Sequence, residues 1–291
     1  MLGLLWLLAC RTADAPDPVD SGTSSTSTTA SEEGLGECEP GGPLQSWLIS
    51  RLSIAPVEDG VSAGFDLDDG AEGCGVDDFV SPDGEDGIDN AFGTLLPALA
   101  LTEAAAIEPL INESITTGNL LITLDLDDLD DPIDDACVTL SVGRGEGEPM
   151  LGTDGELLWA QTIDRSGPPD YRAETSVVGG IVESGLELVL PLELFGLQLN
   201  FELQDGAMRL TYQEDGTVTG VLAGGVPVQD ILTVASEENV DPELVGLMEV
   251  LLASTADLAP DEDGTCTQIS FTMTFETIPV FFFDETATAD D

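Results

Sequence analysis

Histidine and lysine are both absent from this 291-residue sequence, and only six arginines accompany 58 acidic residues. Without histidine the chain lacks the commonest general base and the commonest nitrogen ligand for metals. Without lysine it can form no Schiff base and has no lysine for a phosphate-binding loop. The formal net charge of −52 repels nucleic-acid phosphates and anionic membrane surfaces. We therefore expect no nucleic-acid partner.

Catalytic motifs are also missing. There is no Gly-x-Ser-x-Gly elbow, no phosphate loop and no nucleotide fingerprint, and the glycines around Gly145 only indicate a flexible acidic loop. Glycoside hydrolysis needs only two carboxylates at a set separation, but with 58 acids some pair always fits this criterion. The sequence therefore favours a non-enzymatic role, with a carboxylate-dependent polysaccharide hydrolase as an alternative.

The first ten residues carry a targeting signal. An apolar run from Leu2 to Ala9 leads directly into Cys10, and the ending Leu7-Leu8-Ala9-Cys10 resembles the lipobox of bacterial lipoproteins. The resemblance covers residues 1–43. It implies a signal peptide over residues 1–9, a lipid on Cys10 and attachment to the bacterial outer membrane or cell surface. Ordinary secretion or a periplasmic location is the alternative.

The cysteine count fits this assignment. If Cys10 is lipidated, four of the five cysteines remain, an even number in an exported chain. Two disulfides are expected, and of the three possible connectivities we favour Cys38–Cys74 with Cys137–Cys266. None of the spacings resembles a zinc site.

The chain divides into a tether and a folded part. Residues 10–43 are rich in Ser, Thr, Pro and acidic residues, and this composition predicts a disordered tether. Residues 44–118 combine acidic Asp/Gly-rich loops with a helical hairpin, whose helices are expected over Ile88–Leu99 and from Thr102 to Gly118. Residues 119–283 form the β domain, in one unit with 44–118, and residues 284–291 form an acidic tail.

Period-two alternation dominates after Asn119. It is clearest over Leu186–Leu222, where Asp205-Gly206 and Asp215-Gly216 are expected to be hairpin turns. Helices are expected over Pro227–Ala235 and Pro242–Ala253, the second with an apolar stripe that packs on the core. The fold class is mainly β (α+β): an antiparallel β-sandwich or partly closed barrel, with a helical hairpin before it and two helices before the last strand.

The first acidic region is a candidate calcium site. Calcium takes six to eight oxygen ligands, often from carboxylates at alternating positions of a Gly-containing loop. Asp66, Asp68, Glu72 and Asp77 follow such spacing, although Ala71 stands where the turn favours Gly. A second set, Asp83, Asp86 and Asp89, resembles the Asp/Gly repeats of extracellular calcium-binding proteins. The alternative is a polar loop held by a Cys74 disulfide.

The second acidic region lies between two predicted strands. It contains seven aspartates between residues 125 and 135, and the candidate calcium ligands are Asp125, Asp127, Asp128 and Asp130. Such charge density in a hairpin favours a bound cation, but an exposed turn needs only diffuse screening by salt, and we favour this alternative.

Together these features predict a lipid-anchored, non-enzymatic envelope protein with a structural, adhesive or binding role. Calcium is the candidate cofactor, and the partners are the membrane, through the lipid anchor, and an unidentified protein or glycan. A barrel that binds an apolar ligand is the third interpretation, because the meander strands are rich in Leu and Phe.

Overall fold

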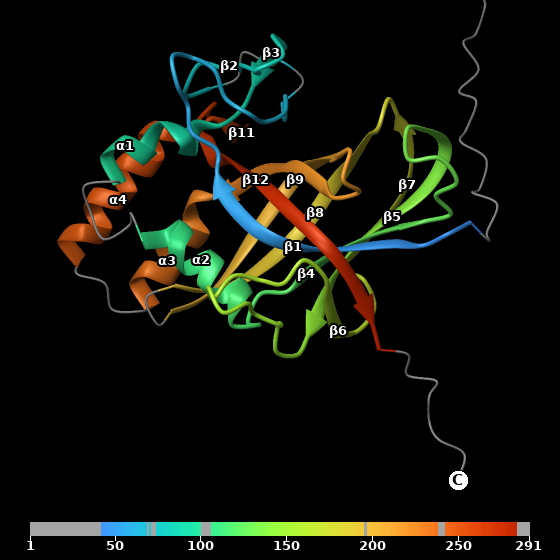
Figure 1. Cartoon of the computed structure of the whole chain (residues 1–291). Coiled ribbons are helices and arrows are strands. Elements are labelled where there is room, and N and C mark those ends of the chain that lie inside the picture. The colour runs from blue at the N-terminus through green and yellow to red at the C-terminus, as the bar shows by residue number, and fades with distance from the viewer. Residues whose placement is uncertain are drawn as a thin grey trace, which may run out of the picture. The chain divides into compact units, whose positions relative to one another are not determined.

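The described strands close into an antiparallel barrel (Figure 1). The structure is a computed structural model that describes residues 42–68, 70, 74–99, 106–194, 197–237 and 242–283. Eight described strands follow one another around the barrel, each antiparallel to its neighbours. They are β1 (Gln45–Ile54), β4 (Ile122–Asp127), β5 (Asp134–Glu146), β7 (Tyr171–Val178), β8 (Ile181–Leu194), β9 (Leu197–Tyr212), β10 (Val218–Pro227) and β12 (Cys266–Phe282). The predicted mainly β class is confirmed. Of the two predicted architectures, a sandwich or a partly closed barrel, the structure has a barrel, and this barrel is closed.

The barrel interior is the main hydrophobic core. Alternate residues of each strand point inward, as the period-two pattern requires. Leu124, Leu140, Leu190, Met208 and Leu222 are all buried in one cluster. An eight-stranded barrel is just wide enough for its side chains to fill, so this core stabilises the closed form.

A second, smaller core covers part of the outer surface. The short strand β6 (Gln161–Arg165) pairs in parallel with the end of β12 and meets β5 at Gly145 and Glu146. The cluster contains Leu48, Leu121, Ile163, Ile278 and Val280. This layer buries outward-facing residues of β1 and β12 that would otherwise face solvent.

The helices gather at one end of the barrel (Figure 1). They are α1 (Leu96–Leu99), α2 (Ile107–Thr116), α3 (Val228–Glu237) and α4 (Pro242–Thr255). The side chain of Asn112 on α2 bonds both the N–H and the carbonyl of Leu52 in β1. Gly118, with a φ of +83°, follows α2 as predicted. None of the helices within the described ranges is long and apolar enough to span a membrane.

The predicted helix over Ile88–Leu99 is shorter than expected. Its start is taken by β3 (Asp86–Ile88), which pairs with β2 (Phe79–Val80). A 3-10 helix (Ala91–Leu95) then leads into α1. The Asn90 side chain caps the 3-10 helix by accepting from the Gly93 N–H. Tertiary pairing of the acidic loops therefore overrides the local helical pattern.

The predicted turn at Asp205-Gly206 is wrong, whereas the turn at Asp215-Gly216 is confirmed. β9 continues through Asp205 and Gly206 as a bulge, and the register shifts against both β8 and β10. Asp205 has a φ of +46°, and a Cβ on Gly206 would lie 2.5 Å from the Ala223 carbonyl oxygen. Asp205-Gly206 therefore lets β8, β9 and β10 pack closely together and does not form a hairpin turn.

The apolar stripe of α4 is only partly buried. Leu252 is 6% exposed, as expected for a core residue, but Leu247 is 63% exposed. The short strand β11 (Leu258–Pro260) follows α4 and pairs with the start of β12. This connection brings Asp257 towards the acidic loops described below.

Candidate functional site

Three aspartates from two chain segments converge on the loops that pack against β12. Asp66 and Asp68 come from the first predicted calcium loop, and Asp89 comes from the second. Each offers a carboxylate oxygen, and the three oxygens lie within 4.8 Å of one another. Among the described residues this is the one group of three or more acids or cysteines with such spacing. We refer to it as the Asp66–Asp68–Asp89 cluster.

Backbone hydrogen bonds orient the cluster. The Asp66 Oδ1 atom accepts from the Gly70 N–H at 2.7 Å, which closes the first loop. The Asp89 Oδ2 atom accepts from the Leu67 N–H, also at 2.7 Å. The Asp89 N–H donates to the Phe65 carbonyl, so the two segments are joined by main chain as well. The loop pair therefore holds its carboxylates in place through main-chain bonds, and the 3-10 helix (Ala91–Leu95) begins two residues after Asp89.

The environment of the cluster penalises negative charge. Asp89 is 3% exposed, and burial together with the nearby carboxylate of Asp68 raises its pKa to about 7. Burial raises the pKa of Asp257 to about 6, and Asp68 adds to that shift. The pKa of Asp78 is raised as well, by burial and by Asp68 and Asp66. Five acidic residues thus share one region of the structure, and a bound cation would relieve their mutual repulsion.

Asp257 was missed in the sequence because it lies far from both loops. The Ser270 N–H and hydroxyl donate to its two carboxylate oxygens, and the Ala91 N–H donates to the same hydroxyl. A local signal was present, since Asp257 is an acid flanked by the apolar residues Ala256 and Leu258.

A disulfide holds the first acidic loop to the barrel. Cys74 is bonded to Cys266 at the start of β12, with their Cα atoms 5.7 Å apart. The predicted pairings Cys38–Cys74 and Cys137–Cys266 are therefore wrong. The reason is tertiary: Gly75 packs against the main chain of Ala256, which places its neighbour Cys74 beside β12. Cys137 is also disulfide-bonded, and Cys38 lies outside the described residues.

The other predicted ligands of the first region are not part of the cluster. Asp77, Asp83 and Asp86 are exposed and belong to no group of three close ligand atoms. Glu72 lies outside the described residues, as does the lipidation candidate Cys10. The two sequence motifs thus contribute to one cluster instead of forming two loops.

The second acidic region is arranged differently. Asp127 and Asp128 accept from the N–H groups of Asp128 and Gly42, respectively, and Asp135 accepts from the Asp130 N–H. Asp125 faces the outer layer, where the Arg165 guanidinium donates to it. The described carboxylates of this region therefore cap the loop backbone or pair with arginine, and they do not converge in a group of three.

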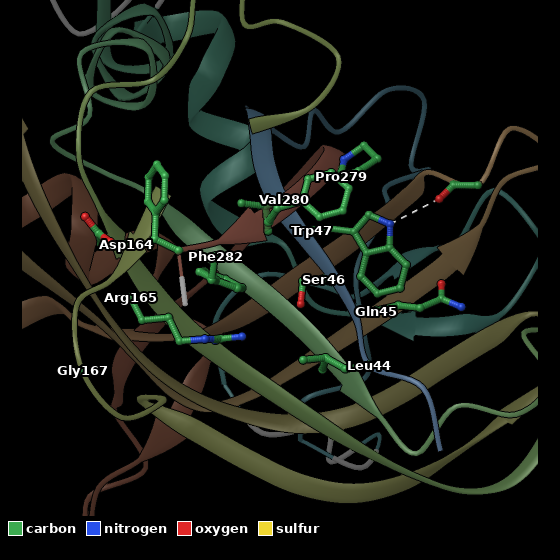
Figure 2. Close-up of a pocket in the computed structure, with 13 residues that line it drawn as sticks. Leu44, Gln45, Ser46, Trp47, Asp164, Arg165, Gly167, Pro279, Val280 and Phe282 are labelled. Atoms are coloured by element: carbon green, nitrogen blue, oxygen red, sulfur yellow. Dashed lines mark hydrogen bonds between the residues drawn. The ribbon is translucent and has the colours of Figure 1, made fainter. Parts of the chain in front are cut away.

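A cavity of about 810 Å³ lies where β1 and β12 separate. Figure 2 shows Arg165 and Phe282 on one side of it and Ser46 and Leu44 on the other. Trp47 borders the cavity and is 2% exposed, and its indole N–H donates to the Gly216 carbonyl. We call this cavity the β1–β12 groove. Because the barrel interior is filled by the core, the groove is a surface feature and not an internal ligand chamber.

A second cavity, of about 500 Å³, lies beside β8 and gathers acidic residues, as the hydrolase alternative would require. Arg144 lies in it, paired with Asp170 and bonded to the Val189 carbonyl. Tyr171 also lines this cavity, and its hydroxyl is bonded to the Ser184 hydroxyl. Two other aromatic residues lie elsewhere: Trp159 is 57% exposed, and Tyr212 packs edge-on against Trp47.

Comparison of the chain with protein-family models, with curated proteins and with solved structures finds no match.

Proposed function

We propose that the protein is a non-enzymatic, lipid-anchored protein of the bacterial cell envelope whose barrel is stabilised by calcium at the Asp66–Asp68–Asp89 cluster. The convergence of these carboxylates from two segments is the observation that carries the calcium assignment. The barrel provides a rigid body held off the membrane by the tether of residues 10–43, in a role of binding or adhesion.

The chemistry of the cluster supports calcium. Calcium binds hard oxygen ligands in flexible geometry and accepts both carboxylates and water. Asp66 and Asp89 each have one oxygen bonded to a backbone N–H, so each keeps a second oxygen for a metal. Burying an ionised Asp89 among other acids is costly, and a divalent cation converts that repulsion into attraction.

The lipid anchor is supported by sequence features that are independent of the calcium cluster. The apolar run before Cys10 has the lipobox ending, and the Ser/Thr-rich residues that follow have the composition of a tether. The net charge of −52 also suits an exported surface in a medium that supplies screening cations.

Thermal unfolding with matched salts tests the calcium assignment. Addition of ~1 mM calcium is expected to raise the midpoint by about 5–10 °C, because a ligand at 100 times its Kd adds ~2.7 kcal/mol. Sodium at equal ionic strength should have a much smaller effect. Asp66→Asn and Asp89→Asn should abolish the calcium shift, and Asp83→Asn should retain it, because Asp83 is exposed and lies outside the cluster.

Two results would remove parts of the proposal independently. Equal stabilisation by sodium and calcium, or full retention of the calcium shift in Asp89→Asn, would refute the metal site. Mass spectrometry of the mature amino terminus tests the anchor, and an unmodified Cys10 would refute lipidation without affecting the calcium result.

A further inference from the structure

The β1–β12 groove is a split in the barrel wall. β1 and β12 are paired from Ile54 and Met273 up to Trp47 and Pro279, and beyond that point they diverge (Figure 1). Proline has no backbone N–H, so Pro279 cannot donate to a strand ladder at the position where pairing ends. Pro279 therefore marks the position at which β1 and β12 separate.

Each diverging strand keeps a partner on its far side. Gln45 and Ser46 of β1 are paired with Leu126 and Asp125 of β4. The end of β12, Val280–Phe282, is paired with Gln161–Ile163 of β6. Within the described ranges, no strand pairs with the two edges that face each other across the groove. Such edges present rows of backbone donors and acceptors that accept an additional strand.

Apolar side chains line the groove and remain accessible. Leu44 is 52% exposed, Phe281 is 62% exposed and Phe283 is 59% exposed, and all three border the same cavity. The cavity volume of about 810 Å³ falls in the usual range for ligand sites. Alternate side chains of an inserted strand could therefore bury apolar surface on the phenylalanines.

Polar groups beside the groove complement a peptide backbone. The Arg165 guanidinium lies over the Phe282 ring, 3.5 Å from its centroid, and only one of its nitrogens donates to Asp125 in the described structure. Arg165 lines the groove, and a peptide carbonyl placed there can accept from its remaining N–H groups.

We propose that the β1–β12 groove binds an extended, basic peptide segment of a partner protein, which adds as a strand between β1 and β12. Main-chain pairing with the two edges supplies affinity, and apolar side chains at alternate positions contact Leu44, Phe281 and Phe283. Charge determines which partner binds. The formal net charge of the chain is −52, and the positive charge of Arg165 is already paired with Asp125. Lysine and arginine on the outer face of the segment are therefore attracted, whereas acidic segments are repelled. This binding role does not depend on calcium.

A synthetic probe tests the proposal on the full chain. The probe is a labelled, acetylated and amidated eight-residue peptide in which valine alternates with lysine, followed by fluorescence anisotropy at ~0.15 M salt. Its control carries the same side chains but has methylated valine nitrogens, which removes backbone donors and leaves the charge unchanged. We expect saturable binding of the probe and at least about tenfold weaker binding of the methylated control.

Matched protein variants test whether the peptide binds in the β1–β12 groove. Phe281→Ser should weaken binding of the probe by about tenfold, whereas Leu247→Ser, at a similarly exposed apolar residue on α4, should leave it unchanged. Circular dichroism checks that both variants are folded, and both substitutions are at exposed residues.

Several outcomes would overturn the proposal. Equal binding of the methylated control would show attraction by charge alone, and equal binding by Phe281→Ser would place the peptide elsewhere. Absence of binding at millimolar probe would refute strand addition. Binding that emerges only after removal of residues 284–291 would assign the groove to the chain's own tail. A dimer that Phe281→Ser dissociates, detected by sedimentation, would assign it to a second copy.

Discussion

The Arg165 guanidinium donates to the Asp125 carboxylate and joins the outer layer to the barrel wall. Asp125 is 6% exposed, although it is on a strand whose other face fills the core. Its second oxygen is buried without a partner in the described structure, so Arg165 provides its one described neutralising contact. A carboxylate that the sequence offers as a calcium ligand is therefore part of a structural ion pair.

Loss of Arg165 should destabilise the fold. Arg165→Gln leaves Asp125 buried and uncompensated, and we expect a loss of about 1–3 kcal/mol, because the partly exposed arginine is screened by solvent. Arg144→Gln is the matched control, since Arg144 and Asp170 are both substantially exposed and should cost less than about 1 kcal/mol. Urea unfolding measures both. Combining Arg165→Gln with Asp125→Asn should recover part of the loss, and equal losses for the two arginines would contradict this account.

Alanine substitution is expected to have opposite effects on stability at two glycines, one in the β9 bulge and one on α4. A Cβ on Gly206 would lie 2.5 Å and 2.8 Å from the carbonyl oxygens of Ala223 and Leu186, which cannot move freely. Gly206→Ala should therefore destabilise the protein by about 2–4 kcal/mol. Gly246 on α4 has nothing within 4 Å of its Cβ position, so Gly246→Ala should stabilise by up to ~1 kcal/mol. Thermal unfolding of the two variants distinguishes them, and a neutral Gly206→Ala would contradict the close approach of Ala223 and Leu186 to this position.

The disulfide connectivity predicts a specific peptide map. Proteolysis without reduction should release a fragment that joins Cys74 to Cys266, two residues separated by 192 positions. Cys266→Ser should lower stability by about 2–5 kcal/mol, because closing a long loop restricts the unfolded chain. It should also weaken the calcium response, since Cys74 follows the loop that carries Asp66 and Asp68. A fragment joining Cys137 to Cys266 would contradict the structure.

Burial of Asp257 predicts a pH dependence with a definite sign. The folded-state pKa of about 6 exceeds the ordinary value of 3.8, so the folded protein binds more protons than the unfolded chain between these pH values. The contribution of Asp257 to stability is therefore fully present below pH ~4 and decreases as the pH rises towards ~6.

Unfolding measurements at several pH values, in buffer with a metal chelator, check this expectation. The slope of stability against pH should be shallower in Asp257→Asn than in the unmodified protein, because the variant has no carboxylate to titrate at this position. Asp83→Asn, at an exposed residue, should leave the slope unchanged. Identical slopes in all three proteins would rule out Asp257 as the source.

Local patterns in the sequence predicted much of the barrel. The pattern that dominates after Asn119 also predicts strands over Ala136–Val142, Arg172–Val178 and Ile269–Phe275. All three lie within observed strands, because alternation reports which face of a strand is buried. Asp215-Gly216 was predicted correctly because a hairpin turn is a local structure. The identical dipeptide at Asp205-Gly206 was not, because the bulge depends on β8 and β10 packing on either side.

The sequence by itself determined the charge, the cysteine inventory and the periodicity, since these depend on residues close together in the chain or on simple counts. It also identified Asp66, Asp68 and Asp89 as separate candidates. Only the tertiary structure decided that these three meet, that Asp257 lies near them, and that Cys74 pairs with Cys266. Barrel closure brings segments nearly 200 residues apart into contact, and no local pattern encodes which distant segments become neighbours.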